Sequence, residues 1–275
     1  MSGRQTRLVV AVSNLTADSD VVVGVAARIA ERTEARLRVV HPLGVVGESL
    51  RKALFGAPPL QQRIEAAARR LSRQVEAALD GAPVAREVVL DHNRADAVTI
   101  VQATSGIADL VVVASEPAVA ALPIASLAGL RTPLLFVPRF ARSGTPCVIQ
   151  ALTQNVAPDA FLRAQRWLRV LQPVFDGRPV AYAEPGEIDI LLCPDTCAGS
   201  SPTESAGAML RSALTERDPA IAVALLPGTE PTETLTFAQT MLRILVAEAR
   251  CPVLAVPSLP ALRPVWTPTA FSLKT

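Results

Sequence analysis

The chain has 275 residues, of which 50% are hydrophobic and 19% are charged. This length fits one large domain or two small ones, and the apolar fraction is sufficient for a sizeable core. The composition excludes a disordered chain, a collagen-like repeat and a disulfide scaffold. The net charge is only +2, and aromatic residues make up 4% of the chain. Nucleic-acid binding is therefore not expected, because it depends on a dense basic face or on aromatic stacking platforms.

Hydropathy and cysteine usage favour a cytoplasmic protein without membrane insertion. The apolar run after the first seven residues is too short for a signal peptide, and the uncharged stretch 117–130 is too short to span a bilayer. Cys193 and Cys197 are separated by three residues, but the two histidines, His41 and His92, both lie in the other half of the chain. We therefore expect reduced, buried thiols and no metal site.

Ten short apolar runs rich in β-branched residues predict strands along the chain. Their residues are apolar at consecutive positions, which is typical of strands covered on both faces in a parallel sheet. In the first half we expect strands at Leu8–Val12, Leu37–Val40, Glu87–Leu90, Leu110–Ala114 and Leu134–Val137. In the second half we expect them at Cys147–Leu152, Pro179–Ala183, Ile188–Cys193, Ile221–Leu226 and Val253–Val256.

Segments with a 3.6-residue apolar period lie between these runs and predict helices. Asp18 and Ser19 are the expected caps of the first helix. The alternation of strands and helices predicts right-handed crossovers and a doubly wound sheet. The four apolar stripes are Val22, Ala26 and Ile29; Ile64, Ala68, Leu71, Val75 and Leu79; Phe161, Ala164, Leu168 and Leu171; and Leu235, Ala238, Leu242 and Leu245.

The two halves of the chain end in the same pattern. Arg131-Thr-Pro-Leu-Leu-Phe-Val-Pro138 closes the first half, and Arg250-Cys-Pro-Val-Leu-Ala-Val-Pro257 closes the second. Each pattern is an Arg-x-Pro sequence that leads into an apolar strand and stops at a proline. We therefore expect two tandem, doubly wound parallel-sheet domains, 1–139 and 145–257, followed by a proline-rich tail, 258–275. The sequence does not assign a structural or functional role to the connection 43–60 or to this tail.

Six segments of the chain match one known domain family in their order and spacing: Leu8–Asn14, Ala26–Ala30, Ala35–His41, Ala108–Ala114, Arg131–Pro138 and, in the second half, Cys251–Pro257. On these segments the first half resembles a universal stress protein domain over nearly all of residues 5–139, and the second half resembles it more weakly. The resemblance implies a Rossmann-like fold and, in many family members, ATP binding. Because family domains pair through their last strands, it also implies an antiparallel pairing of Leu134–Val137 with Val253–Val256 in a pseudo-dimer.

The first half departs from the family at the positions that would bind nucleotide. The family usually has an aspartate at the end of the first strand, near the adenine and ribose, and this chain has Ser13 there. The family's fourth strand usually runs into Gly-x-x-Gly, and the matching stretch here is Ala-Ser-Glu-Pro, which leaves Ser115 as its hydroxyl. Glu116 opposes a phosphate by its charge, and Pro117 lacks an amide donor. Ser13 and Ser115 are the candidates that remain.

The second half keeps the family's loop length from Leu226 to Leu254 but loses most of its glycines. Residues that would still contact a phosphate are Gly228, Thr229 and Thr240, because glycine lets backbone amides approach closely and a hydroxyl adds a donor. Two glutamates nearby in the sequence oppose such a contact by their charge. Nucleotide binding in this half therefore depends on these three residues.

Other candidate residues have structural interpretations that we favour. His41 matches a position where the family commonly has histidine, and we interpret it as a packing residue. His92, beside Asp91 at a strand-to-helix turn, would serve as a general base, but no nucleophile motif accompanies it, so a cap or turn role is favoured. The hydroxyl-rich turn 199–204 is interpreted as a helix cap, although such turns also bind ligands.

Three functions follow from these features. The first is a non-catalytic interaction or regulatory protein of the stress response, with eroded nucleotide sites, no cofactor, and a protein partner or self-association. The second is a stress sensor that binds an adenine nucleotide, ATP or AMP, in one half. The third is a hydrolase that uses Asp91 and His92. The lost glycine loops favour the first function, and the retained loop length with Thr240 favours the second.

Overall fold

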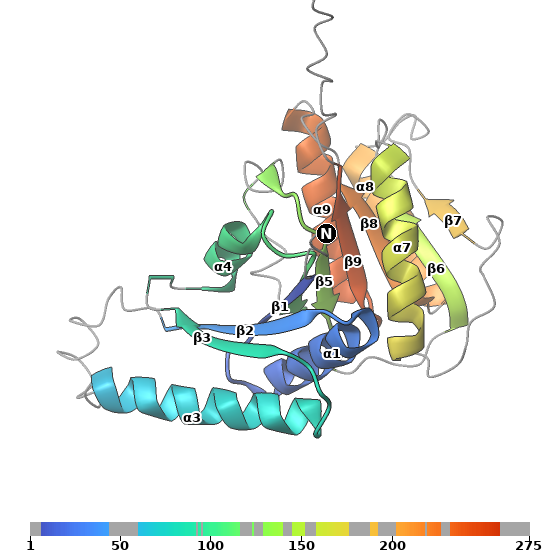
Figure 1. Ribbon diagram of the computed structural model, residues 1–275. Coiled ribbons are helices and arrows are strands. Elements are labelled where there is room, and N and C mark those ends of the chain that lie inside the picture. The colour runs from blue at the N-terminus through green and yellow to red at the C-terminus, as the bar shows by residue number, and fades with distance from the viewer. Residues whose placement is uncertain are drawn as a thin grey trace, which may run out of the picture.

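The computed structural model of the chain shows one sheet of nine strands with helices packed on both faces (Figure 1). The protein is therefore an α/β protein with three layers, as the alternation of strands and helices predicts. The description covers residues 7–43, 60–91, 93–94, 96–115, 123, 129–139, 145–151, 158–175, 188–191, 202–217, 219–226 and 232–258.

The first five strands are all parallel and lie in the order β3-β2-β1-β4-β5. Their positions agree with the predicted runs to within two residues at each end. β1 is the switch strand, because the chain leaves it toward β2 on one side and β4 pairs with it on the other. The bounds are β1 (Leu8–Val12), β2 (Arg36–Pro42), β3 (Arg86–Asp91), β4 (Leu110–Ala114) and β5 (Leu134–Val137).

The remaining four strands are parallel to one another and continue the sheet in the order β9-β8-β6-β7. β7 pairs directly with β6, the first strand of the second half. It therefore corresponds in position to β2, which pairs with β1 in the first half. The prediction made this run the third strand of its half, and the strand expected at 179–183 lies outside the described residues. The bounds are β6 (Thr145–Ala151), β7 (Ile188–Leu191), β8 (Pro219–Leu226) and β9 (Val253–Pro257).

The two sets of strands join through β5 and β9, which pair antiparallel. Leu135 lies opposite Leu254, and Phe136 lies opposite Val253. All four side chains are fully buried. The predicted antiparallel pairing of the last strands is therefore confirmed, and it covers the edges that both strands would otherwise expose.

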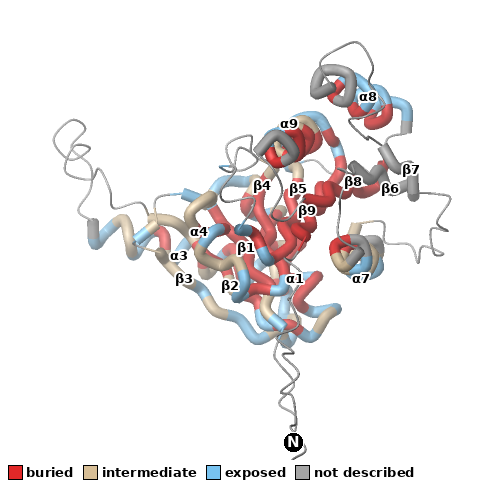
Figure 2. Tube along the Cα trace, turned by 90° about the horizontal axis from the view of Figure 1, so that it is seen from above, coloured by how far each residue is buried: buried red, intermediate tan, exposed pale blue. Residues whose placement is uncertain are grey.

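Helices cover the two faces of the sheet in separate groups (Figure 1). Alternate residues of each strand serve opposite faces: Val9 packs with the first group and Val10 with the second. Figure 2 shows the resulting buried layer of strands between the helices. The first group is α1 (Ala17–Thr33), α3 (Leu60–Leu79) and α7 (Pro158–Phe175), and the second is α4 (Ala97–Thr104), α8 (Pro202–Arg217) and α9 (Thr232–Glu248).

The predicted apolar stripes contribute to the buried faces of α1, α3, α7 and α9, and in α7 the buried stripe residues are Ala164 and Leu171. In α9 the whole stripe is buried, and in α3 Leu71, Val75 and Leu79 are. The expected caps of the first helix are wrong, because α1 begins at Ala17 and its N-cap residue is Thr16. The predicted stripes do not include α4, whose N-cap Asp96 accepts a hydrogen bond from the amide of Thr99 at 2.8 Å.

Both hydrophobic cores run across the junction of β5 and β9. One core joins Phe136 to Val253 and Leu242, and the other joins Leu135 to Leu254 and to α1. The division into domains 1–139 and 145–257 stays a prediction, and most of the connection 43–60 and of the tail 258–275 lies outside the described residues. None of the described helices is long and apolar enough to cross a membrane.

Candidate functional site

The carboxyl ends of β1 and β4 form the switch point of the first five strands. In open α/β sheets, ligands bind outside the carboxyl ends of the strands at such a point. Ser13 follows β1 directly, and Ser115 follows β4. The structure therefore brings these two candidates to the ends of neighbouring strands, as the sequence predicts.

Ser13 is fully buried and its polar atoms are paired within the protein. Its hydroxyl donates a hydrogen bond to Oε1 of Gln74 at 2.7 Å and accepts one from the amide of Leu15 at 3.2 Å. Its amide donates to the carbonyl oxygen of Val40 at 2.9 Å. The side chain thus closes the end of β1 and presents no surface to a ligand.

Gln74 extends this network to the first turn of α1. Its side-chain nitrogen donates to the carboxylate of Asp20, and only 9% of the residue is exposed. The loop between β1 and α1 is held as well, because the hydroxyl of Ser19 bonds to the side chain of Asn14. We call the side chains of Ser13, Gln74 and Asp20 the β1 network. It ties the end of β1 to two helices of the same face, α3 and α1.

The sequence analysis missed Gln74 and Asp20. Gln74 follows Leu71 by three residues, and this spacing places it on the buried face of α3. A polar residue on an apolar face indicates a buried hydrogen bond, because an unpaired polar group would be costly there. This signal was available in the sequence, but it does not identify the partner.

His41 lies at the end of β2 with its Nδ1 2.7 Å from the carbonyl oxygen of Ser13. A carbonyl accepts, so Nδ1 carries the proton and donates. Burial lowers the pKa of His41 below its ordinary value, against the opposing effect of this hydrogen bond. The contact joins β2 to the loop after β1, which agrees with the structural role expected for this histidine.

Ser115 is half-buried at the end of β4. Its amide donates to the carbonyl oxygen of Val137 at 3.0 Å, which continues the pairing of β4 with β5. Glu116 and Pro117 lie outside the described residues. The backbone of Ser115 is therefore part of the sheet, and its side chain is the polar group left at this strand end.

The second-half candidates do not gather at one described place. Gly228 and Thr229 lie outside the described residues. Thr240 lies on α9, about 12 Å along the helix from its first residue, and its hydroxyl donates to the carbonyl oxygen of Thr236 at 3.0 Å. It lines a groove of about 360 Å³ along the outer surface of α8 and α9, together with Arg243 and Glu248.

Asp91 ends β3 and organises the turn that follows. Its carboxylate accepts hydrogen bonds from the backbone amides of Asn93 and Arg94, at 2.9 and 3.1 Å, and forms an ion pair with the guanidinium of Arg94. Burial raises the pKa of Asp91, but the bonds and charge of Arg94 and the amide of Asn93 outweigh it and hold the pKa below its ordinary value. These contacts fit a turn role, and His92 lies outside the described residues.

Metal ligands do not cluster in the part of the chain that the structure describes. Cys251 is buried and not in a disulfide, in line with the expected reduced thiols. Cys193 and Cys197 lie outside the described residues. The described site chemistry therefore consists of hydroxyls, amides, carboxylates and one half-buried imidazole at the carboxyl ends of β1, β2, β3 and β4.

Comparison with solved structures identifies the architecture. A universal stress protein from Archaeoglobus fulgidus DSM 4304 superimposes with a TM-score of 0.55 at 11% sequence identity, over 92% of this chain and 97% of that one. The chain has the fold of a universal stress protein. The superposition extends over both sets of strands, so the likeness that the first half carries in sequence reaches most of the chain in structure.

Another universal stress protein, solved in complex with cAMP, matches this fold less well. It is 20% identical and covers 40% of this chain and 74% of its own length, with a TM-score of 0.27. No protein-family model matches the sequence, and no curated protein matches it significantly. The universal stress protein fold is thus recognised here from structure at low sequence identity.

Proposed function

We propose that this chain is a non-catalytic interaction or regulatory protein, built on the universal stress protein fold, in which the nucleotide site of the first half is eroded. The observation that carries the proposal is the β1 network. Ser13 stands where the family's aspartate would face adenine and ribose, and its hydroxyl is buried and bonded to Gln74. A ligand would have to break this network before it reached the end of β1, at the cost of unpaired buried polar groups.

We further propose that the two halves form an internal pseudo-dimer, with Leu135 and Leu254 at its centre. The antiparallel pairing of β5 with β9 supports this, since each half meets the other through its last strand. Among the described strands, β3 pairs only with β2 and so forms an edge of the sheet. Its Val88 is 38% exposed. An edge strand with an exposed apolar side chain is a suitable surface for a protein partner or for self-association.

The test is the binding of ATP and AMP by the purified protein, measured by titration calorimetry after native mass spectrometry has checked for a co-purified ligand. We expect that no ligand co-purifies with the protein and that neither ATP nor AMP gives a heat of binding. Ser115→Ala and Thr240→Ala report on the first and second halves, respectively. Stoichiometric binding that Ser115→Ala weakens and Thr240→Ala leaves unchanged would overturn the proposed loss of the first-half site.

The alternative function is an adenine-nucleotide sensor that uses Gly228, Thr229 and Thr240. The retained loop length between Leu226 and Leu254 favours it. Against it stands the hydroxyl of Thr240, which already donates within α9. Binding in the same titration that Thr240→Ala weakens by tenfold or more, while Ser115→Ala has no effect, would establish this alternative.

The hydrolase function is the third proposal, and the engaged carboxylate of Asp91 argues against it. His92 would be the general base and Asp91 the carboxylate beside it, but Asp91 accepts from the backbone of its own turn and pairs with Arg94. A screen of phosphate, ester and peptide substrates tests it. We expect no turnover of any substrate. Turnover that is abolished in His92→Ala would overturn the non-catalytic proposal in favour of the hydrolase. A cytoplasmic location and the absence of nucleic-acid partners stay expectations from composition.

A further inference from the structure

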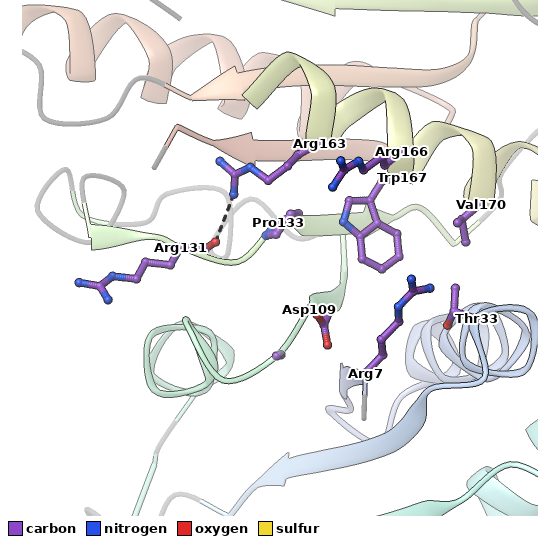
Figure 3. A pocket seen from close by; sticks show the side chains of 10 residues that line it. Arg7, Thr33, Asp109, Arg131, Pro133, Arg163, Arg166, Trp167 and Val170 are labelled. Atoms are coloured by element: carbon purple, nitrogen blue, oxygen red, sulfur yellow. Dashed lines mark hydrogen bonds between the residues drawn. The ribbon is translucent and has the colours of Figure 1, made fainter. Parts of the chain in front are cut away.

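A cavity lies at the opposite edge of the sheet, at the amino ends of β1, β4 and β5. Its volume is about 420 Å³, and α7 and the last turn of α1 form its other walls (Figure 3). Pockets for small ligands typically measure about 300–1,000 Å³. The side chains that matter to the argument are Arg7, Asp109, Pro133, Arg166, Trp167 and Val170.

Four arginines line this cavity, and two of them do not offer their charge to it. Arg163 forms an ion pair with Asp159 at 3.2 Å and donates to the carbonyl oxygens of Arg131 and Pro257. The side chain of Arg131 extends away from the other lining residues (Figure 3). These two arginines therefore shape the wall and hold α7 against the ends of β5 and β9.

The other two arginines, Arg7 and Arg166, lie below and above the ring of Trp167 in the view of Figure 3. Neither forms an ion pair with a carboxylate of the described residues. Asp109 is the acidic residue of the lining, and its Oδ2 accepts a hydrogen bond from the amide of Leu8 at 2.7 Å. The cavity thus holds two cationic groups whose charge no described side chain balances by an ion pair.

Trp167 gives the cavity an aromatic wall. It extends from α7 between the arginines and is partly buried against the core that contains α1 (Figure 3). Pro133 and Val170 continue this wall with apolar surface. An indole face beside guanidinium groups suits a molecule that is flat and apolar at one end and negatively charged at the other.

We propose that this cavity binds a small organic anion, with Arg7 and Arg166 holding its carboxylate or phosphate and Trp167 stacking against its flat apolar part. Arginine binds both kinds of oxyanion through charge-assisted hydrogen bonds, often in pairs. The site lies at the edge of the sheet remote from Ser13. It is therefore independent of the proposed loss of nucleotide binding, and either proposal can fail without the other.

The test uses the fluorescence of Trp167. The chain has two tryptophans, so Trp266→Phe leaves Trp167 as the only one. Three probes share a nitrophenyl ring that quenches indole emission on contact: 4-nitrophenyl phosphate, 4-nitrobenzoate and the neutral 4-nitrobenzyl alcohol. We expect saturable quenching by the two anions and at least tenfold weaker binding of the alcohol. The tighter of the two anions identifies the charged group that the site prefers.

Variants locate the binding. Arg7→Gln and Arg166→Gln should each weaken the binding of the anionic probe by tenfold or more, because each removes a charge-assisted contact. Arg86→Gln is the matched control, since Arg86 is exposed at the amino end of β3, on the same edge of the sheet and outside the cavity. It should leave the affinity unchanged. The melting temperature of each variant without probe confirms that it is folded.

A second measurement uses the natural chain and does not depend on Trp266→Phe. The tighter anionic probe should raise the melting temperature in a concentration-dependent way, and Arg7→Gln should abolish the increase. Equal binding of the neutral alcohol, or quenching that is linear in probe and the same in all variants, would overturn the proposal. So would a loss of affinity in Arg86→Gln equal to that in Arg7→Gln, because it would indicate attraction by overall charge.

Discussion

The two edges of the sheet differ in how they use their polar side chains. At the carboxyl edge, Ser13, Gln74 and Asp20 satisfy one another, and the end of β1 is closed. At the amino edge, Arg7 and Arg166 line a cavity without a described carboxylate to pair with them. The polar groups at the carboxyl end of β1 are thus occupied, whereas the cavity lies at the amino ends of β1, β4 and β5, where the antiparallel β9 ends.

This difference shows why fold and function must be argued separately here. The fold determines that strand ends of the same direction meet at one edge, and this alone makes the carboxyl edge a candidate. Whether that edge can bind depends on single side chains. We propose that the β1 network closes the end of β1. We propose also that Arg7 and Arg166, which form no ion pair with a described carboxylate, attract an anion at the opposite edge.

Phe136→Ala should have the largest effect, because Phe136 belongs to the core that runs across the junction of β5 with β9. Phe136 is fully buried opposite Val253, and truncating a buried phenylalanine costs about 3–5 kcal/mol. We expect a fall of about that size in the free energy of unfolding, measured by denaturant titration. Leu162→Ala on α7 is the control, since Leu162 is 56% exposed. Equal effects of the two variants would show that the junction does not belong to the cooperative core.

Gln74→Ala should have the next largest effect, and it opens the carboxyl edge. It leaves the buried hydroxyl of Ser13 and the carboxylate of Asp20 without their partner, which costs about 1–3 kcal/mol of unfolding free energy. Gln61→Ala is the matched control on the same helix, because Gln61 is exposed and bonds only to Glu65 among the described contacts. A difference below about 0.5 kcal/mol between the variants would show that the network does not hold this edge.

Thr132→Val tests the corresponding support of the amino edge. The hydroxyl of Thr132 is buried, donates to the carbonyl oxygen of Ala108 at 2.8 Å and accepts from the amide of Gly106 at 2.8 Å. Valine keeps the shape and loses both bonds, so we expect a cost of about 1–2 kcal/mol in thermal or denaturant unfolding. Thr240→Val removes a single bond on the outer helix and should cost less than half as much. The reverse order would contradict this account of the edge.

The pairing of β5 with β9 was expected from the resemblance to universal stress proteins, whose domains pair through their last strands, and the structure confirms it. The sequence was sufficient for the positions of the nine described strands, because consecutive apolar residues define a buried strand locally. It was insufficient for the place of β7, because strand order depends on long-range pairing that no local pattern encodes. It was insufficient also for the β1 network, since a polar residue such as Gln74 indicates a buried bond without naming its partner.

The site residues divide in the same way. Ser13, Ser115 and Thr240 are candidates because they match nucleotide-binding positions of the universal stress protein family, and their role stays a prediction. The cavity at the amino edge was not found, because Arg7, Arg131 and the arginines of α7 are distant in sequence and meet only through the packing of α7 against α1. Sequence spacing detects sites within one segment better than sites assembled from several.

The smallest predicted effect is a pH dependence at the carboxyl edge, carried by His41. Burial lowers its pKa in the folded protein below the ordinary value of about 6.5. Between the folded pKa and about 6.5 the unfolded chain therefore binds more protons, and the free energy of unfolding rises with pH across this window. The stabilising contribution of neutral His41 is complete above about pH 6.5 and is lost as the pH falls toward its folded-state pKa. We expect the natural chain to be less stable at pH 5 than at pH 7.

His41→Gln separates this contribution from those of all other groups. The difference in unfolding free energy between the natural chain and the variant, measured by denaturant titration from pH 5 to pH 7.5, should grow in favour of the natural chain as the pH rises. Every group that titrates equally in both proteins cancels in this difference. A difference that is flat, or that shrinks as the pH rises, would mean that His41 is not held in its neutral form by burial. The imidazole would then be free to take a proton at the carboxyl edge, and that edge would be less closed than the bond from Ser13 to Gln74 indicates.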